Sequence, residues 1–226
     1  DRAGYLELLV DELIPEVGRA GLAAFCDVFV EASAFSPDEA RRIFAVGRAA
    51  GLRPKLHADQ LTAGGGAELA AEVGAASADH LEFASEAGMG AMAKAGVVAV
   101  SLPLASLYLG QRPMPARRFI EAGVAVAVAT DFNPGSAPSY HLPFALTLAC
   151  TTQRMTPAET LKGATIYAAR AAGLESRTGS VEVGKSADLA LIDAPDVTQW
   201  LYHLRSNACL ATVASGALFR HGIQGS

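Results

Sequence analysis

Five short apolar runs alternate with helical patterns between residues 26 and 129, and this alternation restricts the fold more than any other feature of the chain. The runs cover residues 26–31, the segment around His57, and residues 76–81, 97–102 and 124–129. Strands separated by helices pair in parallel through right-handed crossovers, and near-continuous apolar strands are covered on both faces. The sequence therefore predicts an α/β fold with about five of the β/α units that build an eight-stranded TIM-type barrel.

Start signals define several of the helices. Ser36 is followed by proline at the first helical position and by an acidic first turn, which predicts a helix that ends near Ala50. Thr156 carries the same signals, with Glu159 completing a capping box, ahead of a helix over residues 157–172. Residues 141–150 also form a helical pattern. At the start of the chain we expect a helix with one apolar face made of Leu6, Leu9, Leu13 and Val17.

The pattern changes after the last of these helices. Residues 179–193 alternate and turn like a β-hairpin, and residues 211–219 form another extended segment. We expect these strands to belong to a small appended β-structure. The predicted organisation is a partial β/α-barrel catalytic domain over residues 1–175 and a β-rich segment of a composite appended domain over residues 176–226.

Composition excludes several functional classes. The formal net charge is −5 and basic residues are not clustered, which argues against nucleic acid as a partner. Apolar runs are interrupted before they reach spanning length, and residues 1–20 lack a signal pattern, so we expect no membrane association. The three cysteines are widely spaced within apolar stretches, which favours reduced thiols and a cytoplasmic location. Because position 1 is Asp, we expect the natural start of the protein upstream.

Three residues that can bind a metal or move a proton stand where apolar runs stop, namely His57, His80 and Asp131. Each of them alone is also typical of a structural residue or a turn cap. In a parallel barrel, however, the carboxyl ends of successive strands face one shared pocket, so three such residues at three strand ends favour a hydrolase active site.

Other candidates carry weaker signals. Glu31 also ends a strand, and it reads equally well as a solvated rim charge or an ion-pair partner. The run Gly64–Gly66 lacks the Lys-Ser/Thr of a phosphate-binding loop, so a flexible turn ahead of a helix is the preferred interpretation. We assign no role to three further histidines, which lie outside strand ends: His141, His203 and His221.

Five segments together resemble one enzyme family. They are His-Ala-Asp-Gln at 57–60, Gly-Gly-Ala-Glu-Leu-Ala-Ala-Glu at 65–72, Ser-Ala-Asp-His-Leu-Glu at 77–82, Ala-Thr-Asp-Phe-Asn-Pro-Gly-Ser at 129–136 and Ala-Cys-Thr-Thr-Gln-Arg-Met-Thr at 149–156. The chain resembles the imidazolonepropionases of the amidohydrolase superfamily along nearly its whole length. Residues 183–189 match the superfamily only in general terms, whereas the 129–136 segment combined with the 77–80 segment is much more specific.

This resemblance implies a metal-dependent hydrolase that opens 4-imidazolone-5-propanoate to N-formimidoyl-L-glutamate in histidine degradation, with one zinc or iron ion as cofactor. It implies His57 and Asp131 as metal ligands, and neutral imidazole and carboxylate are ligands that suit such an ion. Asp131 would also move a proton, and His80 would orient or protonate the group that becomes charged. The residues implied to contact the substrate are Gln60, Asn133, Gly135 and Ser136. Some members of the family carry Glu where this chain has Gln60.

One element of the family pattern is missing from this sequence. Such sites also use a His-x-His pair from the first barrel strand, and the chain contains no His-x-His. His57 and Asp131 alone fall short of the three protein ligands usual for a catalytic zinc ion. We therefore expect a chain that corresponds to the C-terminal half, or somewhat more, of such an enzyme.

The residues leave two other functions open. A different amidohydrolase, either a cyclic amidase or a nucleobase deaminase, would share the metal residues. A catalytically incomplete chain without enzyme activity would share every feature above. In each enzymatic case the partner is a small-molecule substrate, and a homodimer is an arrangement that the sequence allows.

Overall fold

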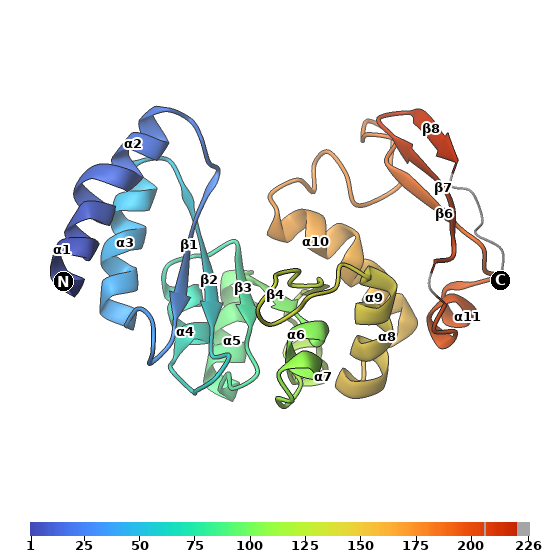
Figure 1. Cartoon of the computed structure of the whole chain (residues 1–226), viewed down its shortest axis with the longest axis horizontal. Helices are drawn as coiled ribbons and strands as arrows, with labels where there is room; N and C mark the ends of the chain where they lie inside the picture. The colour runs from blue at the N-terminus through green and yellow to red at the C-terminus, as the bar shows by residue number, and fades with distance from the viewer. Residues whose placement is uncertain (206, 221–226) are drawn as a thin grey trace. The chain divides into compact units, whose positions relative to one another are not determined.

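The computed structural model describes residues 1–205 and 207–220, and the chain divides into two compact units (Figure 1). The first unit consists of residues 1–101 and 118–126, and the second contains residues 102–117 and the described part of residues 127–226. His221 lies outside the described residues. The predicted domain boundary after residue 175 stays a prediction.

Five strands form one sheet whose order β1-β2-β3-β4-β5 follows the chain. The pairs from β1 to β4 are parallel, with Val28 opposite Leu56 and His57 opposite Asp79. Because a helix separates each strand from the next, the predicted α/β fold with five units of an incomplete TIM-type barrel is confirmed. The strands are β1 (Phe25–Val30), β2 (Arg53–Ala58), β3 (Ser77–His80), β4 (Val98–Ser101) and β5 (Val126–Val128).

Three helices of the first unit cover one face of this sheet: α3 (Pro37–Ala49), α4 (Gly66–Glu72) and α5 (Glu86–Ala95). The predicted cap of α3 is confirmed, because the Ser36 side chain accepts from the backbone N–H of Glu39 and the Glu39 side chain accepts from that of Ser36. Helix α3 packs on β1 and β2, and α4 packs on β2 and β3. Phe44 and Leu69 from these helices and Leu56 from the sheet are almost fully buried, so the core of this unit lies between the helices and the sheet.

The first helical segment is less regular than expected. It runs through α1 (Arg2–Glu7), the π-helical stretch η1 (Leu8–Leu13) and α2 (Ile14–Arg19). The predicted apolar face is confirmed only at Leu6, because the other buried residues are Val10 and Ile14 whereas Leu13 is 49% exposed. The N–H of Ile14 bonds the carbonyl of Leu9, five residues back, and this wider turn changes which side chains share a face.

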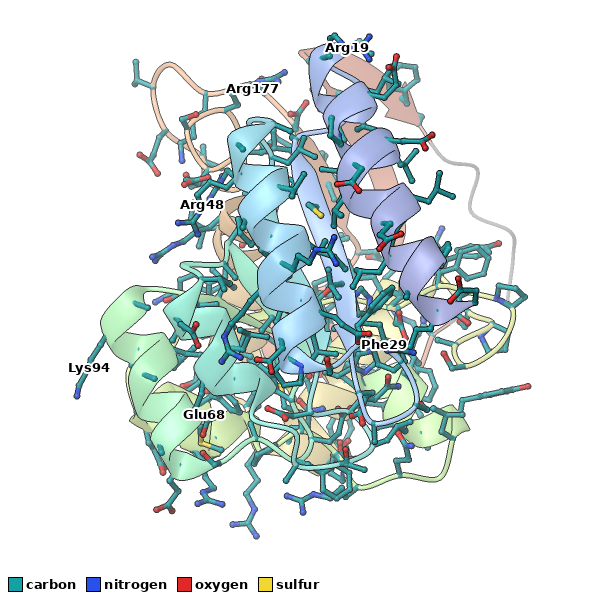
Figure 2. All side chains as sticks on the ribbon, turned by 90° about the vertical axis from the view of Figure 1, so that its left-hand side faces the viewer. Arg19, Phe29, Arg48, Glu68, Lys94 and Arg177 are labelled. Carbon is teal, nitrogen blue, oxygen red and sulfur yellow. The ribbon has the colours of Figure 1, made fainter. Side chains whose placement is uncertain are left out.

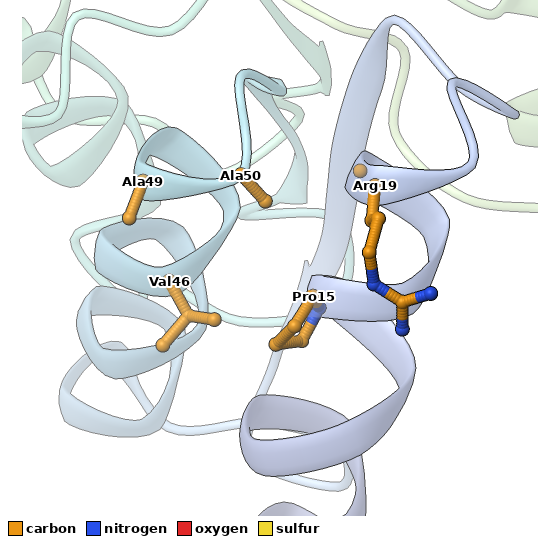
Figure 3. Close-up of a pocket in the computed structure, with 6 residues that line it drawn as sticks. Pro15, Arg19, Val46, Ala49 and Ala50 are labelled. Carbon is orange, nitrogen blue, oxygen red and sulfur yellow. The ribbon is translucent and has the colours of Figure 1, made fainter.

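Helices α2 and α3 lie side by side on the outside of the first unit (Figures 1 and 2). They approach closely at Gly18, where a Cβ would lie 2.5 Å from the carbonyl oxygen of Ala50. A cleft remains between them (Figure 3), lined by Pro15, Gly18, Arg19, Val46, Ala49 and Ala50. This lining contains no histidine, cysteine or carboxylate, so the cleft offers no ligand for a metal ion.

Helices dominate the middle of the chain: α6 (Pro103–Tyr108), α7 (Ala116–Glu121), α8 (Leu142–Gln153), α9 (Pro157–Ala164), α10 (Ile166–Ala171) and, further on, α11 (Val197–Tyr202). The capping box of Thr156 and Glu159 is confirmed. The helix predicted over residues 157–172 breaks at Thr165, whose φ of −122° and ψ of −96° are not helical. Helix α6 was not predicted, although Pro103 at its first position is a start signal. Among the described residues, no helix is long and apolar enough to cross a membrane.

A three-stranded antiparallel sheet follows, made of β6 (Leu189–Ile192), β7 (Cys209–Ala214) and β8 (Ala217–Arg220) in that order. The appended β-structure is thus confirmed, but the hairpin predicted over residues 179–193 is wrong. Val181 and Val183 are exposed and lie outside any strand, so the alternation of apolar and polar residues in this segment does not reflect pairing with another strand. The hairpin is β7–β8, closed by Ser215 and Gly216 with φ of 49° and 83°.

Gly66, at the start of α4, gives a test of how tightly this helix packs on β2. A Cβ there would overlap the Cβ of Ala58 and lie 3.3 Å from its Cα, and neither atom can swing aside. Gly66→Ala should therefore lower the free energy of unfolding by about 1–3 kcal/mol in urea titrations. Gly90→Ala in α5 is the matched control, because nothing lies within 4 Å of its added Cβ. The control should be neutral or stabilising by up to about 1 kcal/mol. Equal effects of the two substitutions would contradict the close packing of α4 on β2.

Candidate functional site

Side chains on the first three strands alternate between two faces of the sheet. On β1 and β2 the buried positions include Val28, Val30, Leu56 and Ala58, which lie under the helices. The intervening positions form the opposite face, which we call the polar sheet face: Asp27, Lys55, His57, Ser77 and Asp79. On this face, His57 lies at the carboxyl end of β2, where the sequence predicts the site.

His57 is held by aromatic and carboxylate neighbours on the two adjacent strands. Its Nδ1 lies 3.0 Å from Oδ1 of Asp27 on β1. The ring of Phe29, also on β1, meets the imidazole edge to face, with 6.4 Å between the ring centroids and 80° between their planes. On the other side, the His80 ring lies 5.6 Å away, centroid to centroid. The structure thus brings together two of the predicted site residues, His57 and His80, on neighbouring strands.

Asp79 completes the polar sheet face beside His57. Burial raises the pKa of its carboxyl group, and the nearby Asp27 adds to that effect, while His57, Lys55 and a hydrogen bond from the Ser77 hydroxyl act in the opposite direction. The Ser77 Oγ donates to Asp79 Oδ1 over 3.1 Å. One ligand atom each from Asp27, His57 and Asp79 lies within 4.8 Å of the others. Carboxyl oxygens and an imidazole nitrogen are therefore concentrated at one place on the sheet.

His80 ends β3 in a buried environment. Its side chain is 3% exposed, and Nδ1 lies 3.7 Å from Oε1 of Glu82, whose side chain is 1% exposed. Both His80 and Leu81 have left-handed backbones, with φ of 77° and 67°. Non-glycine residues in this region cost about 1–3 kcal/mol each, so their surroundings must hold them in place. The N–H of Leu81 donates to the carbonyl of Ala58 over 3.0 Å, which ties this turn to β2.

Gln60 is buried in the loop after β2, and Glu31 holds that loop from the β1 side. The Glu31 carboxylate accepts from the backbone N–H groups of Leu61 and Thr62 and from the Thr62 hydroxyl. Glu31 is itself only 5% exposed. Both interpretations of Glu31 from the sequence are thus wrong, since among the described residues it is neither a solvated rim charge nor an ion-pair partner but an anchor for the loop.

Asp59 holds the same loop from its other end. Its Oδ1 accepts from the N–H groups of Gly64 and Gly66 over 2.9 and 3.0 Å, and its Oδ2 accepts from that of Ala67 over 2.8 Å. The glycine run is therefore a turn that leads into α4, as preferred from the sequence. Because a protein carboxylate already occupies these N–H groups, they do not form a phosphate-binding loop.

The second unit contains the other predicted residues, in the loop after β5. Asn133 organises this loop: its Nδ2 donates to the carbonyl of Asp131 over 2.7 Å and to the Ser136 hydroxyl over 2.9 Å. Its Oδ1 accepts from the N–H groups of Gly135 and Ser136, each over 2.8 Å. The predicted substrate contacts of Gln60, Asn133, Gly135 and Ser136, and the metal-binding role of Asp131, stay predictions.

Sequence reasoning gave no role to three carboxylates that contact these histidines or lie close to them: Asp27, Asp79 and Glu82. A signal was present for Asp27, because it is the one charged residue within the apolar run 25–30. A charge inside a strand that is otherwise apolar indicates a partner on the neighbouring strand. Asp79 and Glu82 lie on either side of His80 and carry no comparable signal on their own.

Comparison with known proteins identifies the family to which this chain belongs. The model of the amidohydrolase family matches residues 29–218, which include β2, β3 and β5 and all the predicted site residues. The chain belongs to the amidohydrolase family. Its strand-end histidines thus lie in a fold family whose members place their active sites at the carboxyl ends of the strands.

Proteins with similar sequences point to one group of enzymes within this family. This amidohydrolase chain is 51% identical over 218 residues to the imidazolonepropionase of Geobacillus thermodenitrificans, covering 96% of this chain and 51% of that protein. It is 48% identical over 218 residues to the imidazolonepropionase of Myxococcus xanthus, covering 96% of this chain and 52% of that one. The resemblance recognised in the motifs is confirmed. The chain spans about half the length of the curated relatives it matches.

Solved structures agree with the fold. The adenosine deaminase of Xanthomonas campestris with bound zinc superimposes with a TM-score of 0.70 and 24% identity over 82% of this chain and 49% of that one. The 5-methylcytosine deaminase of Klebsiella pneumoniae gives 0.77 and 16% identity over 95% of this chain and 60% of that one. At these identities the likeness establishes the amidohydrolase fold alone.

Glu31 makes the stability of this region depend on pH. Burial acts to raise the pKa of its carboxyl group, but the hydrogen bonds from Leu61, Thr62 and Ala32 outweigh burial and hold the pKa below its usual value. A carboxylate with a lowered pKa stabilises the fold above its unfolded pKa, near 4.3, and this contribution is lost as the pH falls through the folded pKa. Glu31→Gln should therefore lower the free energy of unfolding by about 1–3 kcal/mol near neutral pH.

The difference from the unsubstituted chain should shrink below about pH 4, as followed by urea titrations across the pH range. Glu7→Gln, an exposed carboxylate on α1, is the control and should change stability by less than about 0.5 kcal/mol at every pH. A Glu31 effect that stays constant down to acid pH would show that the ionised carboxylate is not what holds the loop.

Proposed function

We propose that this chain carries the C-terminal part of an imidazolonepropionase active site, which hydrolyses the cyclic amide of 4-imidazolone-5-propanoate to N-formimidoyl-L-glutamate. The observation that carries the proposal is the 51% identity to an imidazolonepropionase over 96% of this chain. The pairing of His57 with His80 at neighbouring strand ends gives it a structural basis. The substrate is a small molecule, and the three free thiols, Cys26, Cys150 and Cys209, fit a reducing compartment such as the cytoplasm.

The donor atoms of this chain fit one divalent metal ion, zinc or iron. His57 has its Nδ1 against a carboxylate, which is the usual arrangement of a histidine that ligates a metal through Nε2. His57 and Asp131 would hold the ion. When bound, such an ion would lower the pKa of its water to about 7 and so supply a nucleophile at neutral pH.

Residues of this chain would handle the proton transfers. Ring opening forms a bond between the water oxygen and the amide carbon, breaks the C–N bond and adds a proton to the leaving nitrogen. His80 can hold that proton, because its buried ring lies beside the Glu82 carboxylate. Asp131 would take the proton that water loses. Gln60 can donate and accept hydrogen bonds to the planar ring without taking a proton itself.

A chimera tests the proposal directly, with this chain replacing the matched half of the Geobacillus thermodenitrificans enzyme. It should contain about one metal ion per chain and open the imidazolone ring. His57→Ala should abolish both metal content and turnover, because it removes a ligand. His203→Ala, an exposed histidine in the second unit, is the control and should change neither. A chimera that folds and loads metal but leaves the ring intact would refute the proposed substrate.

Asn133 should separate substrate binding from metal binding in the same chimera. Asn133→Ala removes the side-chain hydrogen bonds that shape the loop after Asp131 and the proposed contact with substrate. We expect kcat/KM to fall by about 10-fold or more while the metal content stays near one ion, measured by turnover and by elemental analysis. Loss of metal equal to that of His57→Ala would show instead that Asn133 serves the metal site.

A further inference from the structure

We propose that Asp27 is a positioning residue that fixes the orientation and the tautomer of His57, so that Nε2 is the nitrogen presented to the metal ion. The inference rests on the proposed function for the identity of that ion, but its geometry stands on the first unit alone. Neither the family model nor the motifs assign a role to Asp27, which lies in a different strand from every residue predicted at the site.

The strand register explains why Asp27 reaches this ring. In the parallel pairing of β1 with β2, Phe29 lies opposite His57 and Asp27 lies one side-chain repeat earlier on the same face. The imidazole leans back along β1 so that Nδ1 meets Asp27 Oδ1 at 3.0 Å. The Phe29 edge and the His80 ring flank it. The His57 side chain is 36% exposed, so the hydrogen bond to Asp27, rather than burial, is what limits rotation of the ring.

The chemistry of the pair then selects the tautomer. An ionised carboxylate only accepts hydrogen bonds, so the Nδ1 atom must carry the hydrogen that Asp27 receives. In the neutral ring the lone pair is consequently on Nε2, which is the form that binds a metal ion. The negative charge of Asp27 also makes Nε2 a stronger donor, as carboxylate partners of metal-bound histidines do in general.

Asp79 is the natural comparison, because it is the other carboxylate beside His57. It lies opposite His57 on β3, and its Oδ1 accepts a hydrogen bond from the Ser77 hydroxyl. Replacing either aspartate by asparagine removes one negative charge from the polar sheet face with little change of shape. The Asp27→Asn replacement also changes the hydrogen-bond partner of His57 Nδ1, because the asparagine amide can turn its NH₂ group toward the imidazole. The Asp79→Asn replacement leaves that partner unchanged.

The test reads the tautomer in the 226-residue chain without metal, and it measures the affinity for Zn²⁺ alone in the chimera, which also contains the upstream half. Nitrogen NMR at about pH 9, where free imidazole is neutral, reports the tautomer of His57, assigned by the signal that His57→Gln removes. We expect a hydrogen on Nδ1 in the unsubstituted chain and in Asp79→Asn, and a shift toward a hydrogen on Nε2 in Asp27→Asn. Competition titrations should show Zn²⁺ affinity about 10- to 100-fold weaker in Asp27→Asn, and a smaller loss in Asp79→Asn.

Several results would overturn the proposal. The first is a hydrogen on Nε2 of His57 in the unsubstituted chain, which needs no substitution of Asp27 and therefore decides the case even if Asp27→Asn fails to fold. The others are an unchanged tautomer in a folded Asp27→Asn, and equal loss of Zn²⁺ affinity in the two variants, which would make the effect one of charge alone. Absence of Zn²⁺ binding by the unsubstituted chimera would count against the proposed metal site, whereas the tautomer would still decide the role of Asp27.

Discussion

The parallel register of β1, β2 and β3 is the constraint on which the candidate site depends. Because side chains alternate along a strand, the same register that buries Val28 against the helices places Asp27 on the polar sheet face. A slip of one residue in β2 would move His57 to the buried face and put an apolar residue in its place. The apolar core under α3 and α4 therefore fixes the position of the chemistry on the opposite face.

Carboxylate and amide side chains give the loops above the sheet their shape. Glu31 and Asp59 accept backbone N–H groups from both ends of the loop that contains Gln60, and Asn133 does the same within its own loop. Loops carry little apolar surface, so side-chain hydrogen bonds of this kind must offset the entropy of ordering them. Glu31, for which the sequence suggested a rim charge, and Asn133, which is predicted to contact substrate, thus hold the backbone of these loops.

The elements could be predicted where local chemistry decides them, and the site could be predicted only in part. Ser36 and Thr156 carry capping signals that depend on a few neighbouring residues, and both helices begin as predicted. The apolar face of the first helix failed because a π-helical turn changes the residue spacing, and residues 179–193 failed because strand alternation is only meaningful with a partner strand. Asp27 was missed for a related reason. Its role depends on pairing with a strand about 30 residues away, as its contact with His57 shows.

Backbone strain is concentrated at the ends of the strands that carry the candidate residues. Among the described residues, six non-glycine residues have positive φ, and four of them are Asp59, His80, Leu81 and Asp131. Aspartate and histidine adopt this conformation more readily than most residues, whereas Leu81 does so only when its surroundings impose it. Hydrogen bonds meet that requirement at each strand end, from the Leu81 N–H to β2, from loop N–H groups to the Asp59 side chain, and from Asn133 to the Asp131 carbonyl. A turn without this strain would be more stable. The strained backbone nevertheless occurs next to His57, at His80 and at Asp131, which argues that these strand ends are shaped for chemistry rather than for stability.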